Sequence, residues 1–494
     1  MNMKPAYEKS DLVRVFVKGG MLSPADLYKI AQTAESLGAS YLHFGSRQDL
    51  LFPIHTPDPE LLEQTFSEIN TLFEYSEAEQ YQNVVSSYVA YNMLPSTGWV
   101  HEDTYYYALS AFDYRPKLKI NVTDPAQAMV PLFSGEINFV ASPYDNYWFL
   151  YLRLPGKPLK EWPDLIYSLD MPGVAQAIEE NQTWAEGKTV TDLWEKMREE
   201  VPYNAREKDV SLLRPSSVVP DYEGMNQMVG GRYWLGLYWR DNQYDTGFLK
   251  AFCQLAMEQD ISRVCLTPWK SFLVKEITAA NRQSWEILLG QFGINMRHSS
   301  LEMNWHLPVL DQQALGLKRF LIKHFDQNDI STYGLSFTVK TKPMVTWTSV
   351  IIERQSSSAM AGAYDLSPTY QVYHTQGFDP NQETLVPYAT DVFQEDLPPL
   401  LMNLSKYYVE QLTQIREGET EKIVETPVAQ EEELETIHQC PHCYTVYEPR
   451  YGDPAQGVAE GTPFEELPTD YACGLCETPV QEFVTLERKA SLSA

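Results

Sequence analysis

Apolar and polar positions near the N-terminus follow a strand period and then a helix period. In VRVFVKGGMLSPADLYKIAQTAESLGASYLHFGSRQDLLFPI (residues 13–54), apolar residues recur at helical spacing from Leu27 to Leu37, behind an N-cap at Ser23 and a proline. Residues 40–44 then alternate as a strand. The segment therefore predicts, in order, a strand, a Gly-Gly turn, a helix and two strands.

A second segment repeats this plan. GGRYWLGLYWRDNQYDTGFLKAFCQLAMEQDISRVCLTPWKSFLVKEI (residues 230–277) matches the first at a constant offset, which places Ser46 and Pro268 in equivalent turns. Each copy is followed by a longer segment of strands with a helix, the last helix being expected around residues 400–414. Two paired α+β half-domains, each carrying an outer lobe, are the simplest architecture for this duplication.

Two aromatic stretches lie in the segment after the first copy. They are HEDTYYYAL (101–109) and YDNYWFLYLRLP (144–155). Aromatic residues are frequent in strands, so both stretches are expected to form half-buried strands.

Charge restricts the classes of partner. The 494-residue chain carries 38 Lys and Arg against 67 Asp and Glu, a formal net charge of −29. Nucleic acids and anionic membranes bind clustered cations, so neither is expected as a partner. No stretch approaches the about 20 apolar residues of a membrane span. The N-terminus lacks the basic and apolar regions of a signal peptide, so a cytoplasmic protein is expected.

Cysteine spacing is the sharpest chemical signal. Four of the six cysteines form two C-x2-C pairs near the C-terminus, Cys440 with Cys443 and Cys473 with Cys476. Two such pairs make a tetrahedral site of four thiolates. The alternative, a disulfide framework, is disfavoured by a reducing compartment and a long, otherwise cysteine-poor chain. The spacing alone fits either structural zinc or redox iron.

The remaining two cysteines differ in context. Cys253 and Cys265 lie in apolar patterns and are expected in the core.

Residues 438–487, around the cysteine pairs, resemble rubredoxin, a small domain that holds one iron in four cysteine thiolates. The matching positions are Tyr447-Glu448-Pro449, Gly452-Asp453-Pro454, Gly457, Gly461-Thr462-Pro463-Phe464, Leu467-Pro468, Asp470, Tyr471 and Glu482-Phe483. The resemblance implies iron and one-electron transfer at a site with no open ligand position. Tyr444, Gly474 and Glu477 depart from the family's Gly, Pro and Gly, so zinc stays as the alternative metal.

Two further expectations concern the side chains of this segment. Four aromatic residues are expected to form a small core over the metal: Tyr447, Phe464, Tyr471 and Phe483. His438 and His442 are expected to be exposed rather than metal ligands, because four thiolates already fill the site.

The duplicated body resembles the sirohaem-containing sulfite and nitrite reductases, in which ferredoxin-like halves join between two lobes. The best local matches are GGMLSPADLYKIAQTAESLG, GSRQ, QNVVSS, RPKLKI, LTPWK and YQVYHTQGFD. The resemblance implies an α+β fold of duplicated ferredoxin-like half-domains with flanking lobes, plus the small C-terminal rubredoxin domain.

The family's contacts to the sirohaem carboxylates map to Arg47, with Gln48 beside it, and to Lys117 and Lys119. On a strand, Arg115 would alternate with these two lysines onto one face, a row of three cations suited to a polyanion, or else an ordinary solvated face. The second-half turn carries Trp269-Lys270 instead of Arg-Gln, which makes Lys270 a further candidate, and Gln82 replaces an arginine.

The family also holds a [4Fe-4S] cluster through four cysteines in the second half. No cysteine occurs between Cys265 and Cys440 here, so no [4Fe-4S] cluster is expected, and the chain alone is not expected to reduce nitrite or sulfite.

Three functions remain open at this point. The first is an electron-transfer protein, a redox subunit or partner of a sirohaem reductase or of its donor. The second is a sirohaem-binding oxidoreductase fed by its own rubredoxin. The third is a zinc-stabilised scaffold without redox activity.

Acidic residues gather toward the C-terminus. Residues 417–435 contain eight Glu and one Lys, and residues 438–487 contain nine acidic residues and one Arg. We expect a solvated tether and an acidic carrier that docks on a basic patch of its redox partner.

The expected domains follow from these resemblances. They are half-domain 1 (1–75), a first lobe (76–225), half-domain 2 (226–300), a second lobe (301–416), an acidic linker (417–437) and a rubredoxin-like domain (438–487).

Overall fold

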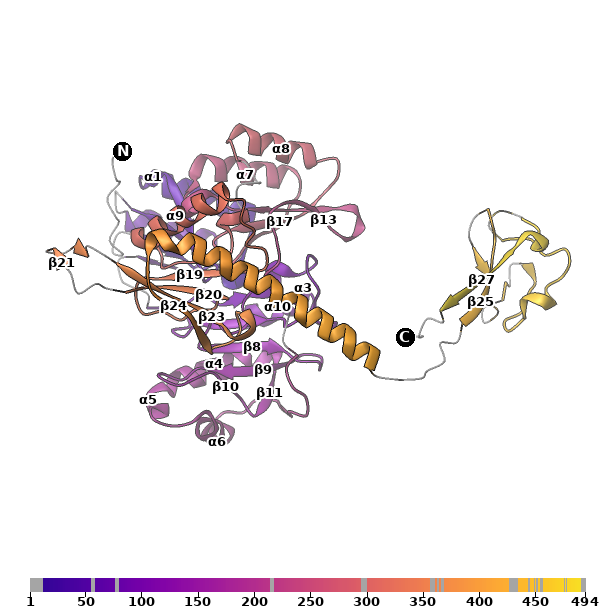
Figure 1. The fold of residues 1–494 in the computed structure, drawn as a ribbon, viewed down its shortest axis with the longest axis horizontal. Coiled ribbons are helices and arrows are strands. Elements are labelled where there is room, and N and C mark those ends of the chain that lie inside the picture. Colours follow the sequence, from indigo (N-terminus) through magenta and orange to yellow (C-terminus); the bar gives the residue numbers. More distant parts are fainter. Residues whose placement is uncertain are drawn as a thin grey trace. The chain divides into compact units, whose positions relative to one another are not determined.

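The computed structural model divides into two compact units, Met1–Leu412 and Thr413–Ala494 (Figure 1). The residues that it describes are 12–54, 58–75, 80–213, 217–294, 300–355, 360–361, 364–365, 368–425, 434–442, 445–447, 449, 452–453, 456–474, 476 and 478–489. Within them, no helix is long and apolar enough to cross a membrane.

The first half-domain is an antiparallel sheet with two helices. Its own strands are β1 (Leu12–Val15), β3 (Tyr41–Phe44), β4 (Leu50–Pro53) and β5 (Phe73–Tyr75), in the order β3-β4-β1-β5. Helix α1 (Pro24–Ser36) begins at Ser23, whose hydroxyl accepts from the Asp26 N–H, as predicted. Helix α2 (Pro59–Glu68) begins in the same way at Asp58.

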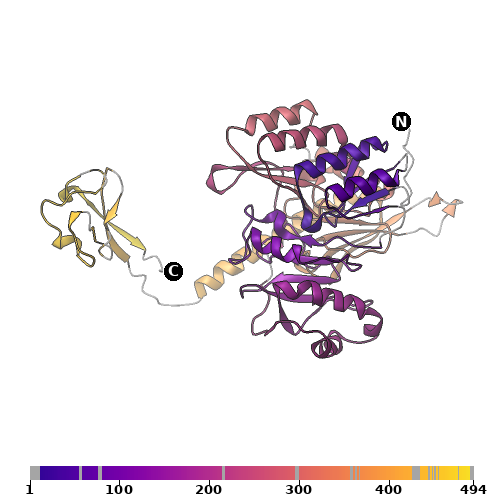
Figure 2. The same cartoon turned by 180° about the vertical axis from the view of Figure 1, so that it is seen from behind.

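The second half-domain repeats this plan. Its own strands are β13 (Gly224–Gln227), β14 (Tyr233–Leu237), β17 (Phe272–Ile277) and β16 (Val264–Leu266), in that sheet order, with helices α7 (Thr246–Glu258) and α8 (Arg282–Gln291). The starts of α1 and α7 differ by the same offset as the starts of β4 and β17, which confirms the duplication. Helices α1 and α7 lie side by side, and the two half-domains share one apolar core (Figure 2).

Each half-domain lends a strand to the other. Strand β2 (Met21–Leu22), directly before α1, pairs with β16 of the second half. Strand β15 (Tyr244–Asp245), directly before α7, pairs with β3 of the first half. Neither five-stranded sheet is therefore complete without the other copy.

The first lobe is built on a seven-stranded sheet. The strands are β6 (Val85–Ser86), β7 (Ile120–Thr123), β8 (Ile137–Ala141), β9 (Tyr147–Leu152), β10 (Lys160–Glu161), β11 (Asp164–Tyr167) and β12 (Ala205–Glu207). The helices are α3 (Glu102–Ser110), α4 (Met171–Glu180), α5 (Gln182–Ala185) and α6 (Val190–Glu200). Strand β9 lies in the second aromatic stretch, as predicted.

The expectation of a strand in HEDTYYYAL is wrong, because these residues form α3. Glu102 and Asp103 occupy its first turn, where carboxylates favour a helix. Tyr105, Ala108 and Leu109 are buried at helical spacing.

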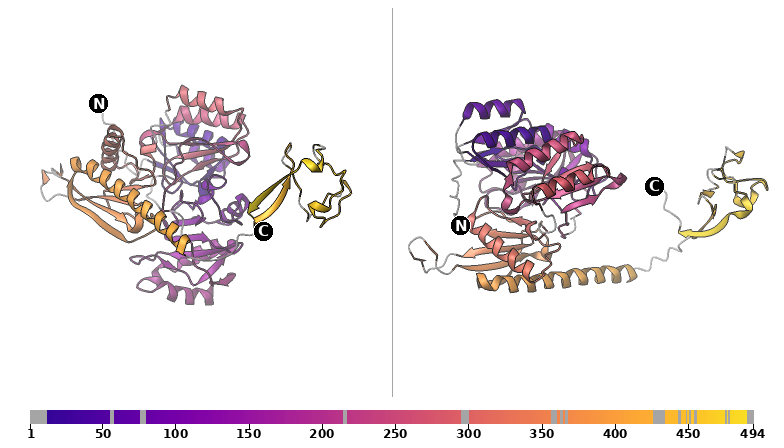
Figure 3. Two further views of the ribbon diagram at one scale, coloured as in Figure 1. Left: turned by 45° about the vertical axis from the view of Figure 1, so that its right-hand side comes forward. Right: turned by 90° about the horizontal axis from the view of Figure 1, so that it is seen from above.

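The second lobe carries a mixed sheet. Its strands are β18 (Trp305–His306), β19 (Phe337–Lys340), β20 (Val350–Gln355), β23 (Thr369–Thr375) and β24 (Leu385–Phe393), with a separate pair of β21 (Met360–Ala361) and β22 (Tyr364–Asp365). Helix α9 (Gln312–Gln327) and the first part of α10 (Leu397–Glu425) pack on one apolar core with this sheet (Figure 3). Because α10 continues to Glu425, residues 417–425 are helical and differ from the predicted tether.

The second unit contains a three-stranded sheet, β26-β25-β27, of β25 (Leu434–Gln439), β26 (Val446–Tyr447) and β27 (Val484–Lys489). A small core of Tyr447, Val458, Leu467 and Tyr471 packs with Phe464 and Phe483. The predicted aromatic core is therefore confirmed.

Candidate metal centre and the predicted cofactor cradle

Three of the four predicted metal ligands converge. The Sγ atoms of Cys440, Cys473 and Cys476 lie within 4.8 Å of one another. Cys443 lies outside the described residues. The Cys440 and Cys476 sulfurs are 3.4 Å apart, far beyond the about 2.05 Å of a disulfide and near the about 3.8 Å between thiolates of a tetrahedral metal site.

Two tight loops present these thiolates. The Cys440 N–H donates to the Thr445 carbonyl at 2.9 Å, and the Cys473 N–H donates to the Thr478 carbonyl at 2.8 Å. Each loop is thus closed by a backbone hydrogen bond that turns its first cysteine inward. Two of the three departures from the rubredoxin pattern, at 444 and 477, lie outside the described residues.

The centre is buried on one side and open on the other. Cys440 and Cys473 are buried, whereas Cys476 is exposed. The Cys476 sulfur also lies 3.1 Å from the Thr478 hydroxyl. An exposed thiolate shortens the path for an electron that leaves or enters the metal.

The two neighbouring histidines behave differently. His442 is exposed, as predicted, and its side chain is 65% accessible. The predicted exposure of His438 is wrong: its ring stacks on Phe464 at 3.8 Å and its side chain is only 14% exposed. The flat face of imidazole packs on an aromatic ring as well as an apolar side chain does.

The donor set fits a single iron or zinc ion. Four thiolates leave no position for substrate, so a bound iron would exchange one electron between its ferric and ferrous states. Because the apolar core of this unit is small, metal binding would also stabilise its fold.

The predicted cofactor residues begin in two equivalent turns. The Gly45 N–H donates to Asp49 O at 2.8 Å, and the Thr267 N–H donates to Ser271 O at 2.9 Å. Gln48 and Lys270 occupy equivalent positions in these turns and adopt left-handed backbone conformations, with φ of 56° and 62°.

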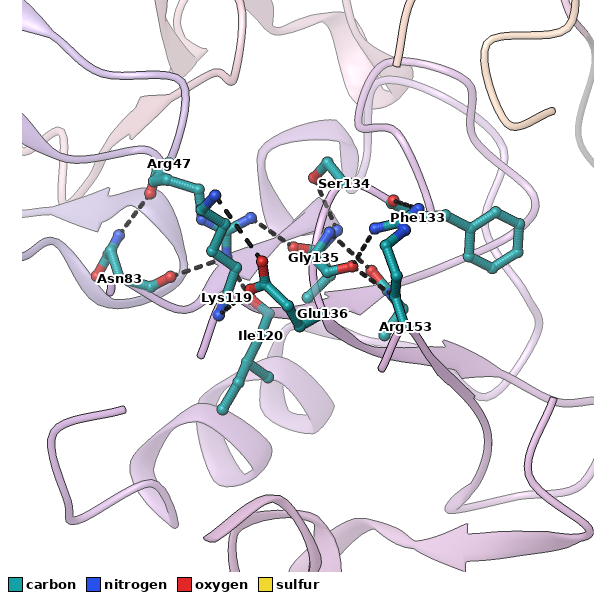
Figure 4. Close-up of polar contacts among 11 residues, drawn as sticks. Arg47, Asn83, Lys119, Ile120, Phe133, Ser134, Gly135, Glu136 and Arg153 are labelled. Carbon is teal, nitrogen blue, oxygen red and sulfur yellow. Dashed lines mark hydrogen bonds and ion pairs between the residues drawn. The ribbon is translucent and has the colours of Figure 1, made fainter. Parts of the chain in front are cut away.

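Arg47 is buried and bound to the protein itself (Figure 4). Its Nη1 donates to Asn121 Oδ1 at 2.7 Å, and its Nη2 donates to the carbonyls of Asn83 at 2.9 Å and Ile120 at 2.7 Å. Burial lowers the pKa of Arg47 to about 10, opposed by the nearby carboxylate of Glu136.

Gln48 and Lys270 are also engaged. The Gln48 amide donates to the carbonyls of Ser86 and Leu266 and accepts from the Ser86 N–H. Lys270 Nζ donates to the Leu307 carbonyl at 2.8 Å. Beside it Trp269 is buried, with its indole N–H bound to the Met129 carbonyl.

The predicted row of three cations does not form. Strand β7 begins only at Ile120, so Arg115 and Lys117 lie on a loop and are exposed. Lys119 pairs with Glu136 instead, Nζ to Oε1 at 3.9 Å (Figure 4).

The residues present therefore do not fit the expected tetrapyrrole cradle. The candidates at 47, 48 and 270 direct most of their polar groups to the protein, although Arg47 Nε is buried without a hydrogen-bond partner, and those at 115 and 117 lie on an exposed loop. Sequence reasoning missed the groups that take the place of a ligand: Asn121 and Glu136.

A link between the two lobes was also missed. Glu383 accepts from Arg153 Nε and Nη2 at 3.0 and 2.9 Å, and Arg153 also holds the Gly135 and Phe133 carbonyls. No local sequence signal marks these contacts, because their partners lie up to 230 residues apart.

Comparisons with known proteins agree with this division into a rubredoxin-like unit and a reductase-like body. Residues 437–483 match the Rubredoxin family, and residues 8–70 match the Nitrite/Sulfite reductase ferredoxin-like half domain. The probable rubredoxin HupI of Bradyrhizobium diazoefficiens is 41% identical over 49 residues, which are 10% of this chain and 71% of that protein. Through this C-terminal domain the chain belongs to the rubredoxin family.

This chain spans a smaller share of another relative. The high molecular weight rubredoxin of Moorella thermoacetica is 40% identical over 68 residues, 13% of this chain and 30% of the relative. The body has the fold of Mycobacterium tuberculosis NirA: TM-score 0.61, 14% identity, and 81% of each chain covered. The chain thus joins a nitrite/sulfite reductase-like body to a rubredoxin domain, and this domain supports cysteine-bound iron and electron transfer.

Proposed function

We propose that this protein is an electron-carrying subunit for a sirohaem nitrite or sulfite reductase, or for the donor of such an enzyme. The rubredoxin-type iron would accept one electron at a time and pass it to the partner. The observation that carries the proposal is the convergence of the sulfurs of Cys440, Cys473 and Cys476, with one thiolate exposed.

The charge of the C-terminal part supports a protein partner. Residues 438–487 carry nine acidic residues against one arginine. Such a surface is complementary to a basic patch around a redox centre, and its attraction steers the encounter of the two proteins. Acidic residues at 417–435 add to the same field.

The body supports docking rather than its own tetrapyrrole chemistry. Arg47 and Gln48 already have protein partners. A reductase-like fold whose buried cradle residues are mostly bound by the protein still presents a surface that a related subunit can match.

One purified sample of the full chain tests the metal and cofactor. We expect about one iron per chain and a red ferric absorption that bleaches on reduction. A colourless protein with zinc would overturn the proposal. A Soret-type band would instead support the sirohaem-binding alternative.

The transfer itself is tested with a purified sirohaem reductase. Reduced protein should reoxidise when mixed with the reductase and its substrate, more slowly at higher salt because screening weakens the attraction. The Cys473→Ser chain should carry no iron and no electrons, whereas Cys253→Ala, at a buried cysteine of the body, should keep its iron and its electron transfer. A reoxidation rate that does not depend on the reductase would contradict the proposed partner.

A further inference from the structure

Two buried lysines from different parts of the first unit line one small cavity. Lys270 belongs to the turn after β16, and Lys318 lies on α9. They are 7% and 3% exposed. The cavity has a volume of about 20 Å³, and Tyr238, Trp305 and Leu307 are among the other residues that line it.

The positive charge of Lys318 is balanced locally. Its Nζ donates to the Tyr238 hydroxyl at 3.0 Å and to the Glu302 carbonyl at 2.9 Å, and lies 3.7 Å from the Glu302 carboxylate. Both side chains of this ion pair, Lys318 and Glu302, are buried.

The positive charge of Lys270 is not balanced in this way. Its Nζ donates to the Leu307 carbonyl, and no carboxylate of the described residues lies within ion-pair distance of it. Asp241, the other acid in the cavity wall, is bound through two 2.9 Å hydrogen bonds to Arg319. The site therefore holds one ammonium group with no carboxylate in contact, and the carboxylates of Asp49 and Asp311 act on it only from a distance.

An ammonium group in the interior is costly unless it loses its proton or gains an anion. Burial and the neighbouring Lys318 lower the pKa of Lys270 to about 7, so the two solutions compete near neutral pH. The volume decides which guest fits: a single water-sized particle needs about 10–15 Å³. The cavity therefore has room for a guest of about that size, and nitrite, with three heavy atoms, fits less well.

We propose that this cavity binds one monatomic halide ion, chloride under ordinary conditions, between Lys270 Nζ and the Lys318–Tyr238 pair. The tyrosine hydroxyl accepts from Lys318, so its own proton can donate to the ion. The ion would attract Lys270 of the second half-domain and Lys318 of the second lobe, and so would hold these two parts together.

Salts of equal ionic strength test the site in the full chain. All 11 tryptophans lie between residues 99 and 347, so their fluorescence reports on the body alone. We expect a melting temperature about 2 °C higher in saturating potassium chloride or bromide than in potassium gluconate. Chloride-35 NMR lines should broaden with the protein and narrow again when bromide competes.

Variants separate this site from nonspecific halide effects. Lys270→Met should abolish both signals, while Lys323→Met, at an exposed lysine of α9, the helix that carries Lys318, should retain both. If Lys270→Met does not fold, Lys318→Met and the wild-type NMR measurement still decide. The iron-free Cys473→Ser chain should keep the halide signals, so this test is independent of the electron-transfer proposal.

Three results would overturn the proposal. They are equal melting temperatures in the three salts, a chloride line width that bromide does not reverse, and a halide effect that survives in Lys270→Met. Competition by nitrite as strong as that by bromide would contradict the size limit.

Discussion

Replacing Arg47 distinguishes a structural role from a cofactor-binding role. In the structure its guanidinium makes three hydrogen bonds, to Asn121 Oδ1 and to the carbonyls of Asn83 and Ile120. The Arg47→Met change removes all three donors and leaves buried acceptors without partners. It also removes a buried charge, and the avoided cost of burying that charge offsets part of the lost stability.

The magnitude follows from these contacts. Each lost hydrogen bond costs about 1 kcal/mol net, and more where the acceptor stays dry. We expect the free energy of unfolding of the body to fall by about 3 kcal/mol, which corresponds to a melting temperature lower by about 3–4 °C for a unit of about 400 residues.

Urea unfolding of the full chain, followed by tryptophan fluorescence, measures this loss. The iron absorption reports separately on the C-terminal unit, which contains no tryptophan. Arg115→Met is the matched control: Arg115 is exposed on a loop and contacts the Tyr81 ring, so its loss should change stability by less than about 1 kcal/mol. If Arg47→Met is as stable as wild type, the contacts in Figure 4 do not support the body, and the structural interpretation is refuted.

Three further predictions use other parts of the chain. Cys473→Ser should lose iron, measured by metal analysis, without moving the tryptophan-detected unfolding transition. A change in that transition would show that the units depend on each other. Cys253→Ala, which removes a thiol from the body, is the control and should keep its iron. Asn242→Ala should lower the free energy of unfolding in urea by about 2–4 kcal/mol, because the side-chain amide binds both the N–H and the carbonyl of Phe44. Asn242→Gly should lose less, since φ at this residue is 57° and glycine tolerates this conformation. An equal loss in the two variants would show that only the hydrogen bonds matter. In halide-free buffer, the pKa of Lys270 is about 7 in the folded state and 10.5 in the unfolded state. Between these pH values the unfolded state binds one more proton, so the free energy of unfolding should rise from pH 7 to pH 9. A fall over this range would contradict a lysine that is buried and loses its proton near neutral pH.

Local signals predicted the parts of this fold that depend on neighbours in sequence. The N-cap at Ser23 and the turns that end at Gln48 and Lys270 follow from short-range chemistry, and so do the paired cysteine loops. The exchange of β2 and β15 was not predictable in this way, because each of these strands pairs with a strand of the other half-domain, and tertiary packing chooses such distant partners.

The cation row failed for a physical reason. The N–H groups of Lys117 and Leu118 donate to the carboxylate of Glu179 on α4, so a side chain takes the place that a neighbouring strand would fill. Pro116 lacks an N–H and disfavours ladder pairing at the same point. Periodicity of charge cannot reveal a distant carboxylate that caps the backbone.

The exchange of strands between the two half-domains has a consequence for synthesis of the chain. A ribosome completes β3 at Phe44, long before it reaches Tyr244, where β15, the strand that covers the edge of β3, begins. Until then the nascent first half presents an open sheet edge, which is prone to pairing with other chains. Expression of residues 12–75 alone should therefore give insoluble protein, and the two halves, supplied as separate polypeptides, should rescue each other only when they are made together.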